Sequence, residues 1–209
     1  LLGGEQSGFI NEIGFETYQK ILAEAVAELK EEEFKDLYPE ESGKKGPFVR
    51  EVQIDTDFEL LFPDDFVNSV SERLRLYTEL NEMSGPRELE AFRARLEDRF
   101  GKLPEKAADL LDSVRLKWMA SDLGIEKLVL KKGSFIGYFI ADQQSDFYQT
   151  ERFGNILRYL QSNPGKGRLK EKQTRKGLRL LITASDIHSV QGALGIMKPL
   201  ASGTEVLSQ

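Results

Sequence analysis

Residues 96–128 read LEDRFGKLPEKAADLLDSVRLKWMASDLGIEKL, and within them one helical pattern ends, a second follows and an extended pattern begins. Gly101 is typical of the position just past a helix end, and Pro104 suits the start of the next helix. Apolar residues then recur at spacings of three and four as far as Gly124, where the period changes. This stretch therefore predicts the boundary between a helical layer and a sheet.

Two further helices are predicted on the N-terminal side of this stretch. The first has Asp64 or Asp65 as its N-cap and extends to about Met83, with apolar residues along one face. The second begins at Pro86 and ends at Phe100. Three consecutive helices favour a bundle-like layer.

Extended chain is predicted in three places. One is the run of aliphatic and aromatic residues over 52–62. The other two are hairpins, each with a glycine in its turn, although the alternation of apolar and polar residues in the first hairpin is imperfect. The hairpins comprise residues 128–130 with 135–140, and residues 169–174 with 178–183.

A helix is also predicted after each hairpin. One covers about residues 145–161, and the last begins near Ser185 or Asp186 as its cap. A helical layer packed on a small, mostly antiparallel sheet is an α+β architecture, which is the fold class that we expect.

By composition the chain divides into three parts. Residues 1–30 are expected to end in an isolated amphipathic helix over 15–29, which must dock on another surface to be stable. Residues 31–50 are predicted to be a charged linker, because nine of the seventeen residues from 31 to 47 are charged. Residues 51–209 are expected to form the α+β domain.

Composition also excludes several classes of protein. The 209 residues include no cysteine and one histidine, which excludes disulfides, thiol nucleophiles and two-histidine metal sites. No apolar run approaches the roughly 20 residues of a membrane span, and no GxxxxGK[ST] phosphate-binding motif occurs. We therefore expect a cytoplasmic, non-catalytic protein with no catalytic or metal-ligating residues, no cofactor and no membrane partner.

The charge of the chain is unevenly distributed. The net charge is −6, but residues 1–65 hold 6 basic and 17 acidic side chains, or −11, and residues 66–209 hold 23 and 18, or +5. The densest basic stretch is opposed only by Glu171. Its members are Lys166, Arg168, Lys170, Lys172, Arg175, Lys176 and Arg179.

Three interpretations of this basic stretch remain open: a docking face for another part of a protein, a nucleic-acid surface, and a solvated hairpin. A nucleic-acid surface would also need exposed aromatic residues that stack on bases. Phe135, Tyr138 and Tyr148 are the candidates for that role, since the other aromatic residues fall mostly at core spacings.

Several motifs resemble the C-terminal end of the bacterial transcription-repair coupling factors. The most specific are DRFG at 98–101 followed by LP at 103–104, and LGIE at 123–126. ERLRLY at 72–77 and the leading residues 1–26 add to the resemblance, which covers nearly the whole chain.

The resemblance implies that the chain is the tail of a large cytoplasmic motor. Such a motor uses ATP and Mg to translocate on double-stranded DNA, displaces stalled RNA polymerase and recruits the repair protein UvrA. It also implies that Gly3, Gln6, Ser7 and Gly8 close the translocation motif shared with RecG, with Gln6 as the polar coupling residue. The helix over 15–29 would then hook onto the motor.

For residues 51–209 the resemblance implies a regulatory role. The domain is expected to dock on the N-terminal UvrB-like region of the same protein and to mask the surface that UvrA uses. The basic stretch from Lys166 to Arg179 is the candidate docking surface on grounds of charge. The alternative is a nucleic-acid-binding module that uses the same stretch.

Overall fold

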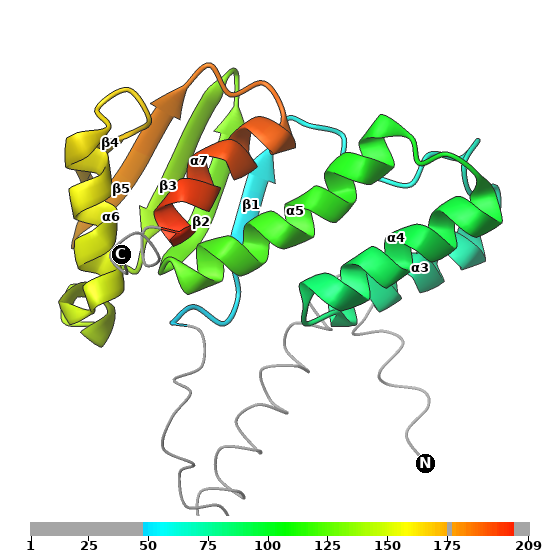
Figure 1. Cartoon of the computed structure of the whole chain (residues 1–209), viewed down its shortest axis with the longest axis horizontal. Coiled ribbons are helices and arrows are strands. Elements are labelled where there is room, and N and C mark those ends of the chain that lie inside the picture. The colour runs from blue at the N-terminus through cyan, green and yellow to red at the C-terminus, as the bar shows by residue number, and fades with distance from the viewer. Residues whose placement is uncertain (1–47, 175–176, 203–209) are drawn as a thin grey trace, which may run out of the picture. The chain divides into compact units, whose positions relative to one another are not determined.

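The computed structural model describes residues 48–174 and 177–202, all of which lie in the compact unit Gly46–Gln209. The predicted helix over 15–29, the linker residues 31–47 and the loop candidates Gly3, Gln6, Ser7 and Gly8 lie outside the described residues. The described elements are β1 (Gln53–Thr56), α3 (Val70–Glu82), α4 (Pro86–Phe100), α5 (Glu105–Asp122), β2 (Ile125–Lys131), β3 (Ser134–Phe139), the 3-10 helix η1 (Asp146–Gln149), α6 (Glu151–Ser162), β4 (Arg168–Thr174), β5 (Gly177–Ser185) and α7 (Val190–Ser202) (Figure 1).

The five strands form one sheet in the order β1-β2-β3-β5-β4. Both predicted hairpins are confirmed, because β2 pairs antiparallel with β3 and β4 pairs antiparallel with β5. The strand β1 pairs parallel with β2 and is only four residues long. At its C-terminal end, the Thr56 hydroxyl donates to the Leu130 carbonyl at 3.1 Å, and the carboxylate of the next residue, Asp57, accepts from the Lys132 amide at 2.9 Å. The fold class is therefore α+β, as predicted.

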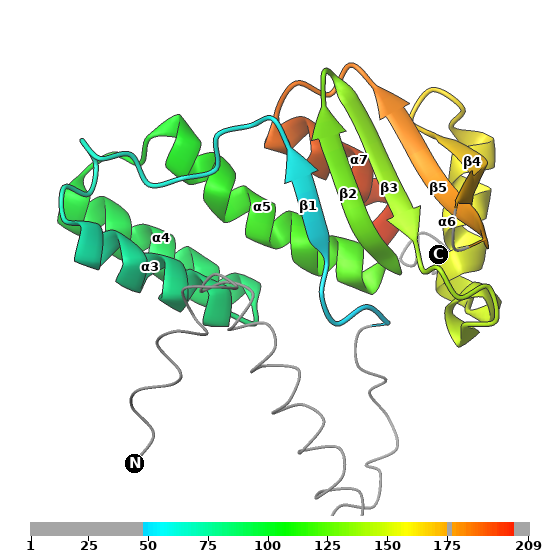
Figure 2. The ribbon, with the colours of Figure 1, turned by 180° about the vertical axis from the view of Figure 1, so that it is seen from behind.

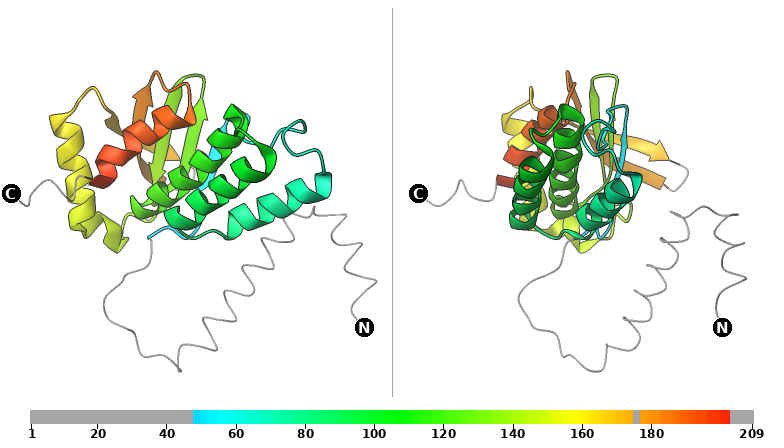
Figure 3. Two further views of the ribbon diagram at one scale, coloured as in Figure 1. Left: turned by 45° about the vertical axis from the view of Figure 1, so that its right-hand side comes forward. Right: turned by 90° about the vertical axis from the view of Figure 1, so that its right-hand side faces the viewer.

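Helices cover one face of this sheet. In Figure 1, α5 and α7 lie in front of the strands, and the edge-on view in Figure 3 shows the helices on the same side. The apolar cluster between the two layers includes Leu116, Ala120, Leu128, Phe135, Ile182, Leu194 and Met197, each at most 1% exposed. Seen from behind, in Figure 2, no helix of the described part lies over the opposite face.

A second apolar cluster holds α3, α4 and the N-terminal half of α5 together. Leu89, Phe92 and Leu96 of α4 are buried there against Leu76 and Leu80 of α3. The predicted layer of three helices is thus present. Because α5 also contributes Leu116 and Ala120 to the cluster under the sheet, this one helix is shared by both clusters.

The structure corrects two of the predicted helix starts. The helix α3 begins at Val70 with Ser69 as its N-cap, whose hydroxyl accepts from the Glu72 amide at 3.3 Å, and not at Asp64 or Asp65. The reason is local: the Pro63 carbonyl accepts from two amides that follow it, at 3.1 and 3.0 Å, and closes a tight turn.

The last helix also starts later than predicted. Ser189, not Ser185 or Asp186, accepts from the Gly192 amide at 3.0 Å, and Asp186 has a φ of 61° that no helix permits. The helix predicted from about residue 145 is likewise divided, with η1 first and α6 after the cap Thr150.

Gly124 marks the passage from α5 to β2 and has no room for a side chain. Its φ is +67°, in the left-handed region that favours glycine, and a Cβ there would lie 2.5 Å from the ring carbon Cζ of Phe147. The glycine that ends the central helical pattern in the sequence is thus fixed by both backbone and packing.

We therefore predict that Gly124→Ala lowers the free energy of unfolding by about 1–3 kcal/mol, because strain and overpacking add. Urea denaturation measures the change. As a control, Gly154→Ala in α6 has nothing within 4 Å of the new Cβ and should stabilise by about 0.5–1 kcal/mol. Equal effects at both positions would contradict the role assigned to Gly124.

Candidate functional site

The basic stretch lies mainly on the edge strand β4. Arg168, Lys170 and Lys172 occupy alternate positions of this strand and are exposed. Successive side chains of a strand point to opposite faces, so these three cations share one face and Glu171 lies on the other. Lys166 is exposed in the turn before β4, and the candidates Arg175 and Lys176 lie outside the described residues.

Arg179 differs from the rest of the basic stretch because its charge is engaged within the domain. Its guanidinium forms an ion pair with Glu126, donates to the Phe139 carbonyl at 3.2 Å and lies 5.6 Å from the ring centroid of Tyr138. Only a fifth of its side chain is exposed. Arg179 therefore fastens β5 to the neighbouring strands and offers little free charge to a partner.

The three cations of β4 belong to a larger surface, the face of the sheet that the helices leave uncovered (Figure 2). We call it the open face. Residues paired across neighbouring strands point to the same side, so the register defines its membership. One row is Asp55, Val129, Ile136, Thr183 and Arg168; a second is Gln53, Lys127, Tyr138, Leu181 and Lys170; Lys131, Ser134, Ser185, Arg179 and Lys172 also belong to the open face.

Positive charge predominates on the open face. Lys131 forms an ion pair with Asp55, and its hydrogen bond and charge hold the pKa of the Asp55 carboxyl below its usual value. Among the described residues, Lys127, Lys170 and Lys172 form no ion pair, and neither does Arg168. The open face therefore presents cations on both sides of an apolar centre: Lys127, whose charge also lowers the pKa of Asp55, on one side, and the cations of β4 on the other.

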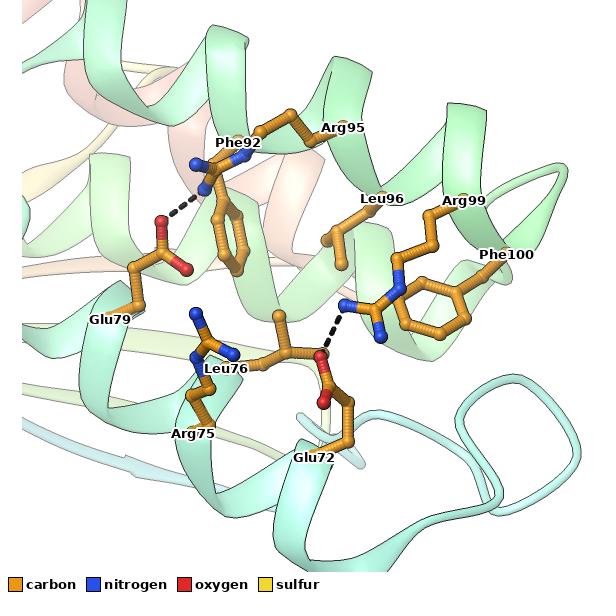
Figure 4. A pocket seen from close by; sticks show the side chains of 9 residues that line it. All are labelled: Glu72, Arg75, Leu76, Glu79, Phe92, Arg95, Leu96, Arg99 and Phe100. Atoms are coloured by element: carbon orange, nitrogen blue, oxygen red, sulfur yellow. Dashed lines mark hydrogen bonds and ion pairs between the residues drawn. The ribbon is translucent and has the colours of Figure 1, made fainter.

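A groove between α3 and α4 is the second candidate site (Figure 4). Its floor is apolar, with Leu76, Phe92 and Leu96 buried, and its rim is charged. Two ion pairs cross it, Arg95 with Glu79 and Arg99 with Glu72. The groove is lined by Glu72, Arg75, Leu76, Glu79, Phe92, Arg95, Leu96, Arg99 and Phe100.

Most charge in this groove is compensated by its own residues. Arg95 lies 5.5 Å from the ring centroid of Phe92, and Arg99 lies 4.9 Å from that of Phe100, so both guanidinium groups are held against rings as well as carboxylates. In Figure 4 the guanidinium of Arg75 lies between the two glutamates without an ion pair among the described residues. We therefore interpret the groove as a set of contacts that stabilise the packing of α3 against α4, and not as a binding site.

Two kinds of site can be checked among the described residues, a metal site and a base-stacking surface. They contain no cluster of three or more His, Cys, Asp or Glu side chains that could hold a metal ion. Of the aromatic candidates for base stacking, Phe135 is fully buried, and the Tyr148 hydroxyl donates to the Ile140 carbonyl while its ring contacts Phe153. Tyr138 alone of these three lies on the open face.

No helix in the described ranges is long and apolar enough to cross a membrane. Fold and sites together define an α+β domain with one open, basic sheet face. Residues 56–150 match the family model named TRCF domain. This match covers 95 of the 209 residues and agrees with the resemblance to transcription-repair coupling factors that the sequence predicted.

Several relatives carry the same name. The transcription-repair-coupling factor of Escherichia coli (strain K12) is 38% identical over 131 residues, which is 61% of this chain and 10% of the relative. That of Myxococcus xanthus is 37% identical over 132 residues, 61% of this chain and 10% of the relative. That of Rickettsia prowazekii (strain Madrid E) is 27% identical over 198 residues, 93% of this chain and 16% of the relative. The chain thus spans at most 16% of these relatives.

A solved structure supports the fold. A crystal structure of the C-terminal domain of transcription-repair coupling factor matches with a TM-score of 0.56, covering 76% of this chain and 96% of that one. The two sequences are 14% identical, so this likeness concerns the architecture.

The groove between α3 and α4 yields a prediction about stability. Because the arginines of its ion pairs are exposed and the glutamates partly so, the double substitution Glu72→Gln, Glu79→Gln should lower the free energy of unfolding by about 1 kcal/mol or less. Leu96→Ala, which empties the buried floor, should cost about 2–5 kcal/mol. Urea titrations of the two variants check this, and a loss from the glutamine pair as large as that from Leu96→Ala would show that charge holds the helices together.

Proposed function

We propose that this chain is the C-terminal regulatory module of a longer cytoplasmic protein and docks on the N-terminal UvrB-like region of that protein. Docking would cover the surface that UvrA uses and hold the protein in a resting state. In this proposal the parent protein uses ATP and Mg to translocate on double-stranded DNA and displaces stalled RNA polymerase.

The observation that carries the proposal is the row of cations on β4. Arg168, Lys170 and Lys172 lie on one face, are exposed and form no ion pair within the described part of the chain. Charges placed in this way steer a partner and fix its orientation more than they add affinity. Weak contacts suffice for two regions of one chain, because tethering raises their effective concentration.

Release of the module would follow as a shift between two states. A docked and an undocked form interconvert, and whatever binds the undocked form better increases its population. RNA polymerase and DNA are the ligands that we propose for the undocked form. A tenfold change in the docking equilibrium corresponds to about 1.4 kcal/mol, so loss of a few rim charges is enough to bias it.

A second candidate function is nucleic-acid binding by the same cations, which the presence of Tyr138 on the open face favours. Two features weigh against it: the ring of Tyr138 is already covered by Arg179, and the whole chain carries a net charge of −6.

For the docking proposal we predict that Lys170→Glu, Lys172→Glu weakens binding of the UvrB-like region at least about tenfold, because attraction becomes repulsion. Isothermal titration with the purified region measures the affinity. The matched control is Lys117→Glu, Lys198→Glu, which reverses two exposed lysines on α5 and α7. Docking elsewhere is indicated if both variants bind like the unaltered chain.

For the alternative, gel-shift titrations with duplex DNA at about 50 and 200 mM salt are decisive. On the docking proposal we expect no tight complex at either concentration. A complex that weakens steeply between the two salt concentrations, and that Lys170→Glu, Lys172→Glu abolishes, would favour nucleic-acid binding instead.

A further inference from the structure

The central strands of the sheet have the composition of strands covered on both faces. A strand with one solvated face alternates apolar and polar residues, whereas strands buried on both faces form continuous apolar runs. Leu128-Val129-Leu130 in β2 and Leu180-Leu181-Ile182 in β5 are such runs. Yet among the described residues helices cover only one of the two faces (Figure 2).

The residues responsible for this excess lie together at the centre of the open face. By register Val129 pairs with Ile136, and Tyr138 pairs with Leu181, on three adjacent strands. Leu181 is 5% exposed, and the other three are partly exposed. Val129, Ile136 and Tyr138 thus form an apolar patch that the described part of the chain leaves partly uncovered, whereas Leu181 is already buried.

Cations flank this patch on both sides. Lys127 lies on β2, toward one edge of the sheet, and Lys170 and Lys172 lie on β4, the opposite edge strand. A partner that fits must therefore combine an apolar strip with carboxylates on either side. Five strands spaced about 4.8 Å apart are roughly 19 Å wide, enough for one helix of about 10 Å diameter with room for its flanking side chains.

We propose that the open face is a protein-docking surface that binds an acidic amphipathic helix. Its apolar strip would cover Val129, Ile136 and Tyr138, and its carboxylates would pair with Lys127, Lys170 and Lys172. Val129 and Ile136 offer no ring on which a base can stack, and the ring of Tyr138 is already covered by Arg179, so the composition favours a protein over nucleic acid. That the helix belongs to the UvrB-like region rests on the proposed function, whereas the chemistry of the surface does not.

The surface itself is tested with a synthetic helical peptide of about 18 residues, with leucine along one face and glutamate on both flanks. Amide chemical shifts of the 209-residue chain map its contact. We expect shifts at Val129, Ile136 and Tyr138, and at least about tenfold weaker binding when lysine replaces each glutamate. Absence of binding at millimolar peptide, or shifts confined to the groove between α3 and α4, would overturn the proposal. It would also be overturned if duplex DNA at physiological salt shifted these amides and the peptide did not.

The apolar contribution is tested with Val129→Thr, Ile136→Thr, which retains β-branched side chains and hence the strands. Its affinity for the peptide should fall about tenfold, while Val70→Thr, Leu74→Gln, at two apolar residues of α3 that are each 62% exposed, should bind unchanged. If circular dichroism shows that the threonine variant is unfolded, Lys127→Glu replaces it, and a similar loss is expected.

Unchanged affinity in the folded variant overturns the proposal. The UvrB-like region is titrated in parallel. If the peptide binds and the UvrB-like region does not, this inference is retained and the proposed function is rejected. If the region binds and Val129→Thr, Ile136→Thr does not change its affinity, this inference is rejected and the proposed function is retained.

Discussion

The architecture depends on α5, because this helix is buried in two apolar clusters at once. Its N-terminal half contributes Leu111 to the cluster of the helical layer, and its C-terminal half contributes Leu116 to the cluster under the sheet. At the changeover lies Asp112, a carboxylate with only 5% of its side chain exposed, which accepts hydrogen bonds from Arg115 and from Gln191 of α7. A charge buried this deeply persists only with such partners, so packing and polar contacts fix the same junction.

Much of this fold could be predicted from the sequence, and the parts that could not be predicted depend on contacts other than the residue's own local preference. Gly101, Pro104 and Gly124 act through local backbone preferences, which the sequence displays directly, and each marks a helix end or start as predicted. Asp64 and Asp65 have side chains that are equally suited to capping. The Phe66 and Val67 amides, however, already donate to the Pro63 carbonyl and are not free for a cap. The parallel pairing of β1 with β2 joins residues more than 70 positions apart and leaves no local sign.

The candidate sites, too, could be predicted only in part from the sequence. Charge counting located the cations of β4, but only the register shows that Glu171 lies on the other face and that Arg179 is engaged by Glu126. The apolar centre of the open face did leave a sign in the sequence, the imperfect alternation of the first hairpin. Its meaning became clear only when Val129 and Ile136 were found side by side on an uncovered surface.

The position of β4 at the rim of the sheet has a consequence for the behaviour of the chain in concentrated solution. A seven-residue strand at an edge has unpaired backbone groups that can add a strand from another molecule. Two such strands from identical copies would bring Arg168, Lys170 and Lys172 against their own counterparts, and like charges at strand spacing repel. The same three side chains therefore protect the protein from edge-to-edge aggregation, whichever partner they bind.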